Sequence, residues 1–171
     1  MNAAAKYADT KSDAVARRAA RLAAVQALYQ MELTGADAET VADEFIAHRF
    51  DNEAEVAPVG APDQEFFGSV MRGVPHHQVE IDRAIARCLS DDWKLERIDS
   101  ILRAIMRAAA FELIARPDVP ARVVIDEYVE IAHAFFAGQE PGFVNAALDR
   151  LARIKRAPEF GETPPSGEIE F

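Results

Sequence analysis

Residues 95–116 have the sequence LERIDSILRAIMRAAAFELIAR, and this stretch decides the fold class. Its apolar side chains recur every three or four residues, as on one face of an α-helix; these are Ile98, Leu102, Ile105, Ala109 and Leu113. The pairs Asp99–Arg103 and Glu112–Arg116 are each four residues apart, so we expect ion pairs on the outer side of this helix. Pro117 ends it, because proline lacks the backbone N–H that a helix needs. The pattern predicts one long amphipathic helix.

Helical patterns lie on both sides of this stretch. Two follow it, from Pro120 to Gly138 and from Pro141 to about Arg156. Three precede it, from about Asp13 to Gly35, from Thr40 to about Arg49, and from Gln64 to Leu89 with a bend or break at 73–75. No segment alternates apolar and polar residues with the period of a β-strand. The sequence therefore predicts an all-α fold.

The chain has 171 residues, which is enough for one domain-sized core. We expect the helical domain to occupy residues 14–156. A flexible basic arm is expected at 1–13 and a disordered acidic tail at 157–171, where prolines and glutamates gather. Residues 51–63 combine Pro, Gly and acidic residues and are expected to form a loop.

The formal net charge of −10 argues against a general nucleic-acid coat, because binding to phosphates usually needs an excess of cations. The charge is unevenly distributed, however. Residues 1–31 hold five basic and two acidic side chains, and residues 146–156 hold four basic and one acidic side chain. Residues 32–65 hold ten acidic side chains and one basic side chain. The two basic segments coincide with predicted helices, so they are the places to look for an anionic partner.

Several other classes of site find no support. Cys88 is the one cysteine, so a disulfide within the chain and a multi-cysteine metal site are excluded. We find no nucleophile motif, no phosphate-binding loop and no paired helical metal motif, so we expect no enzyme activity, no metal and no cofactor. The longest stretch without charged residues is only ten residues, which predicts a soluble, cytoplasmic protein with no membrane contact.

The basic N-terminal helix is the strongest functional lead. Arg17, Arg18 and Arg21 cluster near its start, and Tyr29 lies eleven residues after Arg18, so that the two share a face about 16 Å long. Gln26 lies close to Tyr29 on the helix surface. Arginines bind phosphates, a tyrosine ring stacks on an unpaired base, and an amide can contact a base edge. This combination suits single-stranded RNA, although a helical adaptor that binds only proteins would have the same spacing.

Four linked motifs resemble the NusB family of transcription antitermination factors. The first is Ala16-Arg17-Arg18-Ala19-Ala20-Arg21 running into Ala24-Val25-Gln26-Ala27-Leu28-Tyr29-Gln30. The others are Ala110-Phe111-Glu112-Leu113 before Pro117-Asp118-Val119-Pro120, Val124-Ile125-Asp126-Glu127 with Val129-Glu130-Ile131-Ala132, and Phe143-Val144-Asn145 before Leu148-Asp149-Arg150. Their order and separations match the family over about residues 14–156.

The resemblance implies a compact bundle of about seven helices in two small helical halves, without catalytic activity. It implies a factor that binds boxA-type RNA of ribosomal RNA leaders together with NusE, a small-subunit ribosomal protein, within an RNA polymerase antitermination complex. The implied RNA-facing residues are Arg17, Arg18, Arg21, Gln26, Tyr29, Phe143 and Asn145. Both a monomer and a homodimer are compatible with the sequence.

Overall fold

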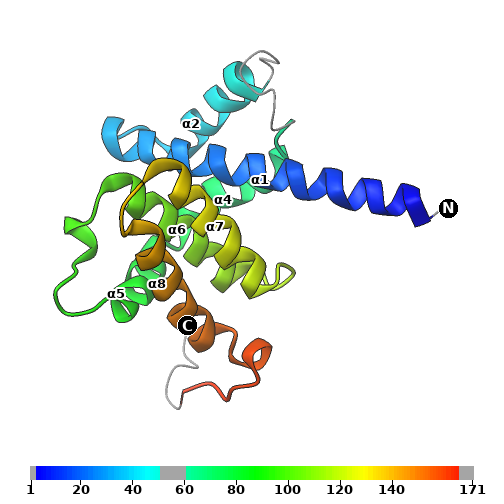
Figure 1. The fold of residues 1–171 in the computed structure, drawn as a ribbon. Helices are drawn as coiled ribbons and strands as arrows, with labels where there is room; N and C mark the ends of the chain where they lie inside the picture. Colours follow the sequence, from blue (N-terminus) through cyan, green and yellow to red (C-terminus); the bar gives the residue numbers. More distant parts are fainter. Residues whose placement is uncertain (1–2, 51–60, 166–171) are drawn as a thin grey trace. The chain divides into compact units, whose positions relative to one another are not determined.

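The computed structural model describes residues 3–50 and 61–165. These residues form seven α-helices and no strand, so the predicted all-α class is confirmed (Figure 1). The helices are α1 (Ala3–Thr34), α2 (Ala38–Phe45), α4 (Gln64–His76), α5 (Gln78–Cys88), α6 (Ser100–Ala115), α7 (Ala121–Phe135) and α8 (Glu140–Lys155). Short turns of other helix types are η1 (Ile46–Phe50), η2 (Leu95–Arg97) and η3 (Ala157–Phe160). No helix in the described part of the chain has both the length and the apolar character needed to cross a bilayer.

The chain divides into two compact units, one ending at His76 and the other starting at His77. This division lies in the predicted helix from Gln64 to Leu89, which is broken as expected. Pro75 cannot donate the backbone hydrogen bond that would continue α4, and the helix ends one residue later. A new helix then begins, with the Ile81 N–H donating to the His77 carbonyl at 2.9 Å.

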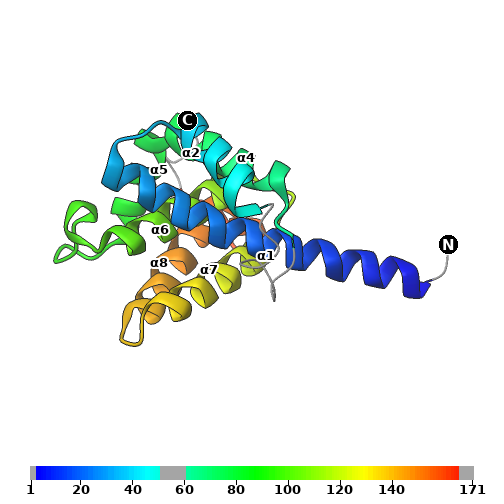
Figure 2. The same ribbon diagram turned by 90° about the horizontal axis from the view of Figure 1, so that it is seen from above.

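In the first unit, α2 and α4 pack on α1 and on each other. Their contact is apolar and aromatic: Phe45 and Phe67 stack with ring centroids 5.9 Å apart. The backbone of Asp63, just before α4, donates to the Ala16 carbonyl of α1 at 2.9 Å. The turns of α1 before Ala16 project beyond α2 and α4 in both views (Figures 1 and 2).

The start of α1 differs from the prediction. The helix begins at Ala3, ten residues before Asp13, which was expected to cap it. Alanine has the highest helix propensity, and the residues before position 15 are rich in alanine, so the helix continues through Asp13. The predicted end is correct: Gly35 has a positive φ of 71° and its N–H donates to the Met31 carbonyl at 2.9 Å.

In the second unit, α6 packs against α5, α7 and α8. The predicted stripe of Ile98, Leu102, Ile105, Ala109 and Leu113 is buried. The helix itself starts later than expected, because Asp99 accepts hydrogen bonds from the N–H groups of Ile101 and Leu102 and so caps it. Residues 95–97 form the separate turn η2.

One surface pair expected on α6 was placed wrongly. Glu112 is fully buried, with 0% of its surface exposed, so Glu112 and Arg116 cannot form a pair on an outer face. Burial on α6 extends without interruption from Ala108 to Leu113, because neighbouring helices cover several sides of it. Arg116 instead forms a two-pronged ion pair with Asp118, each N–O distance being 2.9 Å.

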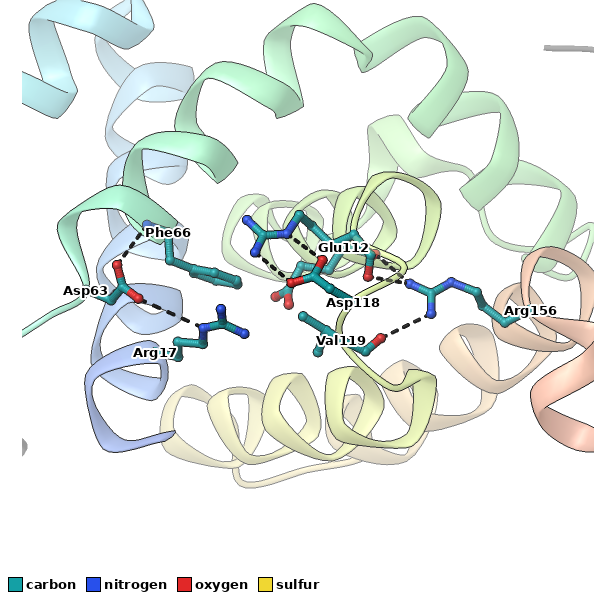
Figure 3. Close-up of polar contacts among 8 residues, drawn as sticks. Arg17, Asp63, Phe66, Glu112, Asp118, Val119 and Arg156 are labelled. Atoms are coloured by element: carbon teal, nitrogen blue, oxygen red, sulfur yellow. Dashed lines mark hydrogen bonds and ion pairs between the residues drawn. The ribbon is translucent and has the colours of Figure 1, made fainter. Parts of the chain in front are cut away.

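Arg156 closes the C-terminal end of α6 (Figure 3). It is 9% exposed, and its guanidinium donates to four backbone carbonyls, at 2.7–3.1 Å, and to the Glu159 carboxylate at 2.8 Å. The carbonyls belong to Glu112, Leu113, Arg116 and Val119. The Glu112 and Arg116 carbonyls also accept the backbone N–H groups of Arg116 and Val119, at 3.0 and 3.1 Å. The Arg156 guanidinium therefore adds a donor at each of four carbonyls around a helix end, where N–H partners become scarce.

The order of the chain therefore extends past the boundary expected at 157. Ala157 is buried, and Glu159 accepts a hydrogen bond from the Ala121 N–H at 3.0 Å at the start of α7. The ring of Phe160 lies between the guanidinium groups of Arg122 and Arg153, at 5.2 and 4.8 Å. The tail prediction did not include these contacts, because a short turn with one proline and one glutamate has no periodicity that a sequence pattern can detect.

Replacing Arg156 by alanine should lower the free energy of unfolding by about 3–5 kcal/mol, because four carbonyls and the Glu159 carboxylate each lose the hydrogen bond that this buried guanidinium donates. Urea denaturation followed by circular dichroism would measure this change. Arg97→Ala, at an exposed position in η2, is the matched control and should change stability by less than about 0.5 kcal/mol. Equal stabilities of the two variants would contradict this role for Arg156.

The Glu159 carboxyl should make stability depend on pH. The Ala121 N–H hydrogen bond, and after it the Arg156 guanidinium, lower its pKa from the ordinary value of 4.5. A lowered native pKa stabilises the fold above the unfolded pKa, and this stabilisation is lost as the pH falls through the native pKa. We expect Glu159→Gln to be less stable than the wild type at neutral pH, with a difference that shrinks below about pH 4. Thermal melts from pH 7 to pH 3, with exposed Glu96→Gln as control, would check this.

Candidate nucleic-acid interface

The arginine cluster of α1, Arg17, Arg18 and Arg21, lies where α4 begins. Two of its members contact the same aromatic ring: the guanidinium of Arg17 is 5.1 Å and that of Arg21 is 4.9 Å from the centre of Phe66. Phe66 itself is only 2% exposed. The cationic groups thus cover a buried ring, and the attraction between cation and ring face stabilises the junction of α1 and α4.

Asp63, which directly precedes α4, also stabilises the junction of α1 and α4 (Figure 3). One of its carboxylate oxygens accepts the Phe66 N–H at 3.0 Å and so caps α4, while the other lies 3.9 Å from Arg17 Nε. Together with the backbone hydrogen bond from Asp63 to Ala16, these contacts determine the position of Arg17. Arg17 keeps about a third of its side chain exposed and can still reach a ligand.

The three arginines therefore differ in what they can bind. Arg21 is 3% exposed, so its guanidinium is mainly a packing group beside Phe66. Arg18 is exposed, and Arg17 is half-buried. A phosphate in solvent could approach Arg18 first and Arg17 second, while Arg21 positions the ring against which Arg17 lies.

The face expected to connect Arg18 with Tyr29 is interrupted. Val25 lies on the same stripe of α1 and is fully buried, and Leu22 is half-buried. The spacing of 4, 3 and 4 residues from Arg18 to Tyr29 is also the spacing of a buried helix stripe, which explains why periodicity alone could not separate the two. Gln26 is exposed and Tyr29 is half-buried, and they are neighbours on the helix surface.

The two α8 candidates face different ways. Phe143 and Asn145 are separated by about 200° around the helix, so they lie on opposite flanks of the buried stripe that contains Val144. Asn145 is exposed. Phe143 is half-buried, and its ring lies 5.2 Å from the ring of Trp93, at an angle of 39°.

Sequence reasoning missed two aromatic residues at these places. Trp93 is 51% exposed and lies in the connection between α5 and η2, where no helical periodicity marks it. The one feature of the sequence that could have drawn attention to Trp93 is that it is the single tryptophan of the chain. Phe66 was hidden because it belongs to an apolar pair at the start of α4, which looks like ordinary core. Five of the seven predicted residues thus lie on α1 in the first unit, and two on α8 in the second.

Comparison with known proteins identifies the class. The model of the NusB family matches residues 18–153, which is more than half of the chain. The chain belongs to the NusB family.

Its relatives carry one protein name. The transcription antitermination protein NusB of Maricaulis maris is 51% identical over 160 residues, which are 94% of this chain and all of that protein. The protein of the same name from Caulobacter vibrioides is 54% identical over 140 residues, or 82% of this chain and 94% of the relative. Both relatives are named as transcription antitermination proteins, so this chain is a transcription antitermination factor.

Solved structures agree with the fold. The structure of T. maritima NusB superimposes with a TM-score of 0.71 at 32% identity, covering 85% of this chain and 96% of that one. A second structure, of the antitermination factors NusB and NusE in complex with double-stranded RNA, gives a TM-score of 0.64 at 23% identity. It covers 80% of this chain and 96% of the matched chain.

The contact of Arg21 with Phe66 should be measurable as a coupling. In a double-mutant cycle of Arg21→Met and Phe66→Leu, we expect the two changes to be non-additive by about 0.5–2 kcal/mol, since each alone removes the same cation–ring contact. Urea unfolding of the four proteins would give the value. A control cycle pairs Arg21→Met with Phe45→Leu, whose ring is contacted by Arg49, and should be nearly additive. Additivity in both cycles would refute the energetic role of the contact.

Proposed function

We propose that this antitermination factor binds boxA-type single-stranded RNA of ribosomal RNA leaders, with α1 of the first unit as the main RNA-binding element. The observation that carries the proposal is the exposed side chain of Arg18 next to Arg17. Arg17 is half-exposed and is held in place by Asp63 and Phe66. Guanidinium groups in fixed positions bind phosphates with less loss of side-chain freedom than mobile ones.

Further along α1, Gln26 and Tyr29 supply groups suited to unpaired bases. The Gln26 amide is exposed and can donate to or accept from a base edge. Tyr29 keeps part of its ring accessible for stacking. Because the buried Val25 lies between these residues and Arg18, the proposal has two contact points on the RNA: one to the backbone and one to bases.

Phe143 and Asn145 are kept as secondary candidates in the proposal, and Arg21 as the residue that positions Phe66. Since Phe143 and Asn145 lie on opposite flanks of α8, one nucleotide cannot contact both side chains from the same direction. Their substitution is expected to affect RNA binding independently.

The proposed protein partner is NusE, with which this chain would enter an RNA polymerase antitermination complex. A solved relative contains NusB together with NusE and RNA. The chain has 19 basic and 29 acidic side chains, so acidic groups outnumber the cations available for RNA, and a basic ribosomal protein would extend the positive surface. We therefore expect RNA to bind weakly to the chain alone and more tightly in the presence of NusE.

The test is a titration of fluorescently labelled boxA-type RNA, followed by anisotropy at several salt concentrations, with and without NusE. Arg18→Ala should weaken binding about three- to tenfold, and should reduce the slope of log affinity against log salt by about 0.7 for one lost phosphate contact. The matched control is Arg83→Ala, an exposed helical arginine of the second unit.

Three results would contradict parts of this proposal. Equal affinities of wild type and Arg18→Ala would remove α1 from the RNA site. An affinity that NusE leaves unchanged would remove the cooperative role of the partner. Binding of NusE with no RNA binding in either state would favour the alternative function, an adaptor that contacts only proteins.

A further inference from the structure

We infer that the N-terminal extension of α1 lengthens the RNA-binding track, with Lys11 as an additional phosphate contact before the arginine cluster. The inference rests on the proposed RNA binding and adds a residue to it. Lys11 lies outside residues 18–153, the part of the chain that matches the family model.

The first step is the register of the helix. Because α1 is continuous from Ala3 to Thr34, residues before and after position 16 share one helical frame. Lys11 and Arg18 are seven residues apart, so they lie within about 20° of the same direction around the helix and about 10.5 Å apart along it. The two cationic side chains therefore form one row along α1.

The second step is the charge on the other side. The nearby acidic residues are Asp9 and Asp13, each two residues from Lys11, so both helix positions lie about 160° around the helix from Lys11. Asp13 also lies about 140° around the helix from Arg18. An RNA strand along the row of Lys11 and Arg18 would consequently have the Asp13 carboxylate turned away from its phosphates. The same residue types in an unstructured arm would not separate the charges in this way.

The third step is access. Residues 11–15 are all exposed, and the first hydrogen bond between α1 and the segment before α4 is made at Ala16. Figure 2 shows this part of α1 extending beyond α2 and α4 of its own unit. Among the described residues of the first unit, no element covers the row, since Lys11 and Arg18 are both exposed. An exposed helical extension of this kind has no packing energy of its own. An RNA strand bound along it would supply contacts that the unit does not.

The spacing also suits nucleic acid. Along a stacked strand one phosphate occurs about every 3.4 Å, so the 10.5 Å between Lys11 and Arg18 corresponds to about three nucleotides. A short RNA that contacts Arg18 would end before Lys11, whereas an RNA with several more nucleotides on the correct side would reach it. The effect of Lys11 should therefore depend on RNA length.

The experiment compares a core boxA-type RNA with versions extended by about six nucleotides at either end. For wild type, one extended RNA should bind about two- to fivefold more tightly than the core. Lys11→Ala should abolish this gain and reduce the salt slope with that RNA by about 0.7, while leaving core binding unchanged. Lys94→Ala, which removes an exposed lysine of the second unit, is the control for net charge and should keep the gain.

A second variant tests whether the helix, rather than the charge alone, is needed. Ala14→Pro retains Lys11 but interrupts α1 between Lys11 and Arg18, and should also abolish the gain. Retention of the gain in Lys11→Ala or in Ala14→Pro would overturn the inference. If the core RNA binds and depends on Arg18 while neither extension adds affinity, the inference fails and the proposed function stands. If no RNA binds at all, both fail.

Discussion

A helix that ends inside a protein leaves carbonyl groups without donors, and the second unit depends on how that deficit is met. Arg156 supplies its guanidinium to four carbonyls at the end of α6 and in the connection to α7. Glu159, three residues later, pairs with this guanidinium and accepts the N–H of Ala121. Two residues near the end of the chain thus hold both the last turn of α6 and the first turn of α7, the two helices that flank Pro117.

The first unit relies on a related arrangement with an aromatic ring at its centre. Phe66 lies under the guanidinium groups of Arg17 and Arg21, while Asp63 caps α4 and approaches Arg17. Here the residues that the family resemblance implies for RNA binding also determine how α4 packs on α1. In the proposed RNA site, recognition and stability would therefore share side chains, with Arg18 exposed and Arg21 buried.

The fold class and most helix positions could be predicted because helical periodicity and the residues that end helices are local signals. Gly35 ends α1 and Pro75 lies at the end of α4, as expected, because glycine tolerates a positive φ and proline has no backbone N–H to donate. The burial of Glu112 could not be predicted, because it depends on how many neighbours surround α6. The ordered turn after Arg156 was missed for the same reason, as its partners lie about 40 residues earlier in the chain.

At the candidate site, the sequence indicated that the predicted residues on α1 share one helix, but not the accessibility of each residue. Arg17, Arg18 and Arg21 are the same residue type, and it is their packing against Phe66 and the approach of Asp63 to Arg17 that distinguish them. The stripe from Arg18 to Tyr29 looked continuous because its spacing is that of a helix face, whereas Val25 within it is buried. Trp93 had no periodic context and was found only through its contact with Phe143.

The shared contact of Arg17 and Arg21 with the ring of Phe66 has a consequence for how this protein can evolve. A substitution at Arg21 alters the packing around Phe66 and, with it, the contact that Arg17 makes with the same ring, so selection acts on both contacts at once. Exposed positions such as Arg18 and Lys11 have no such double constraint. Sequence drift can therefore proceed through the exposed row of α1, while the buried arginine and its ring stay unchanged.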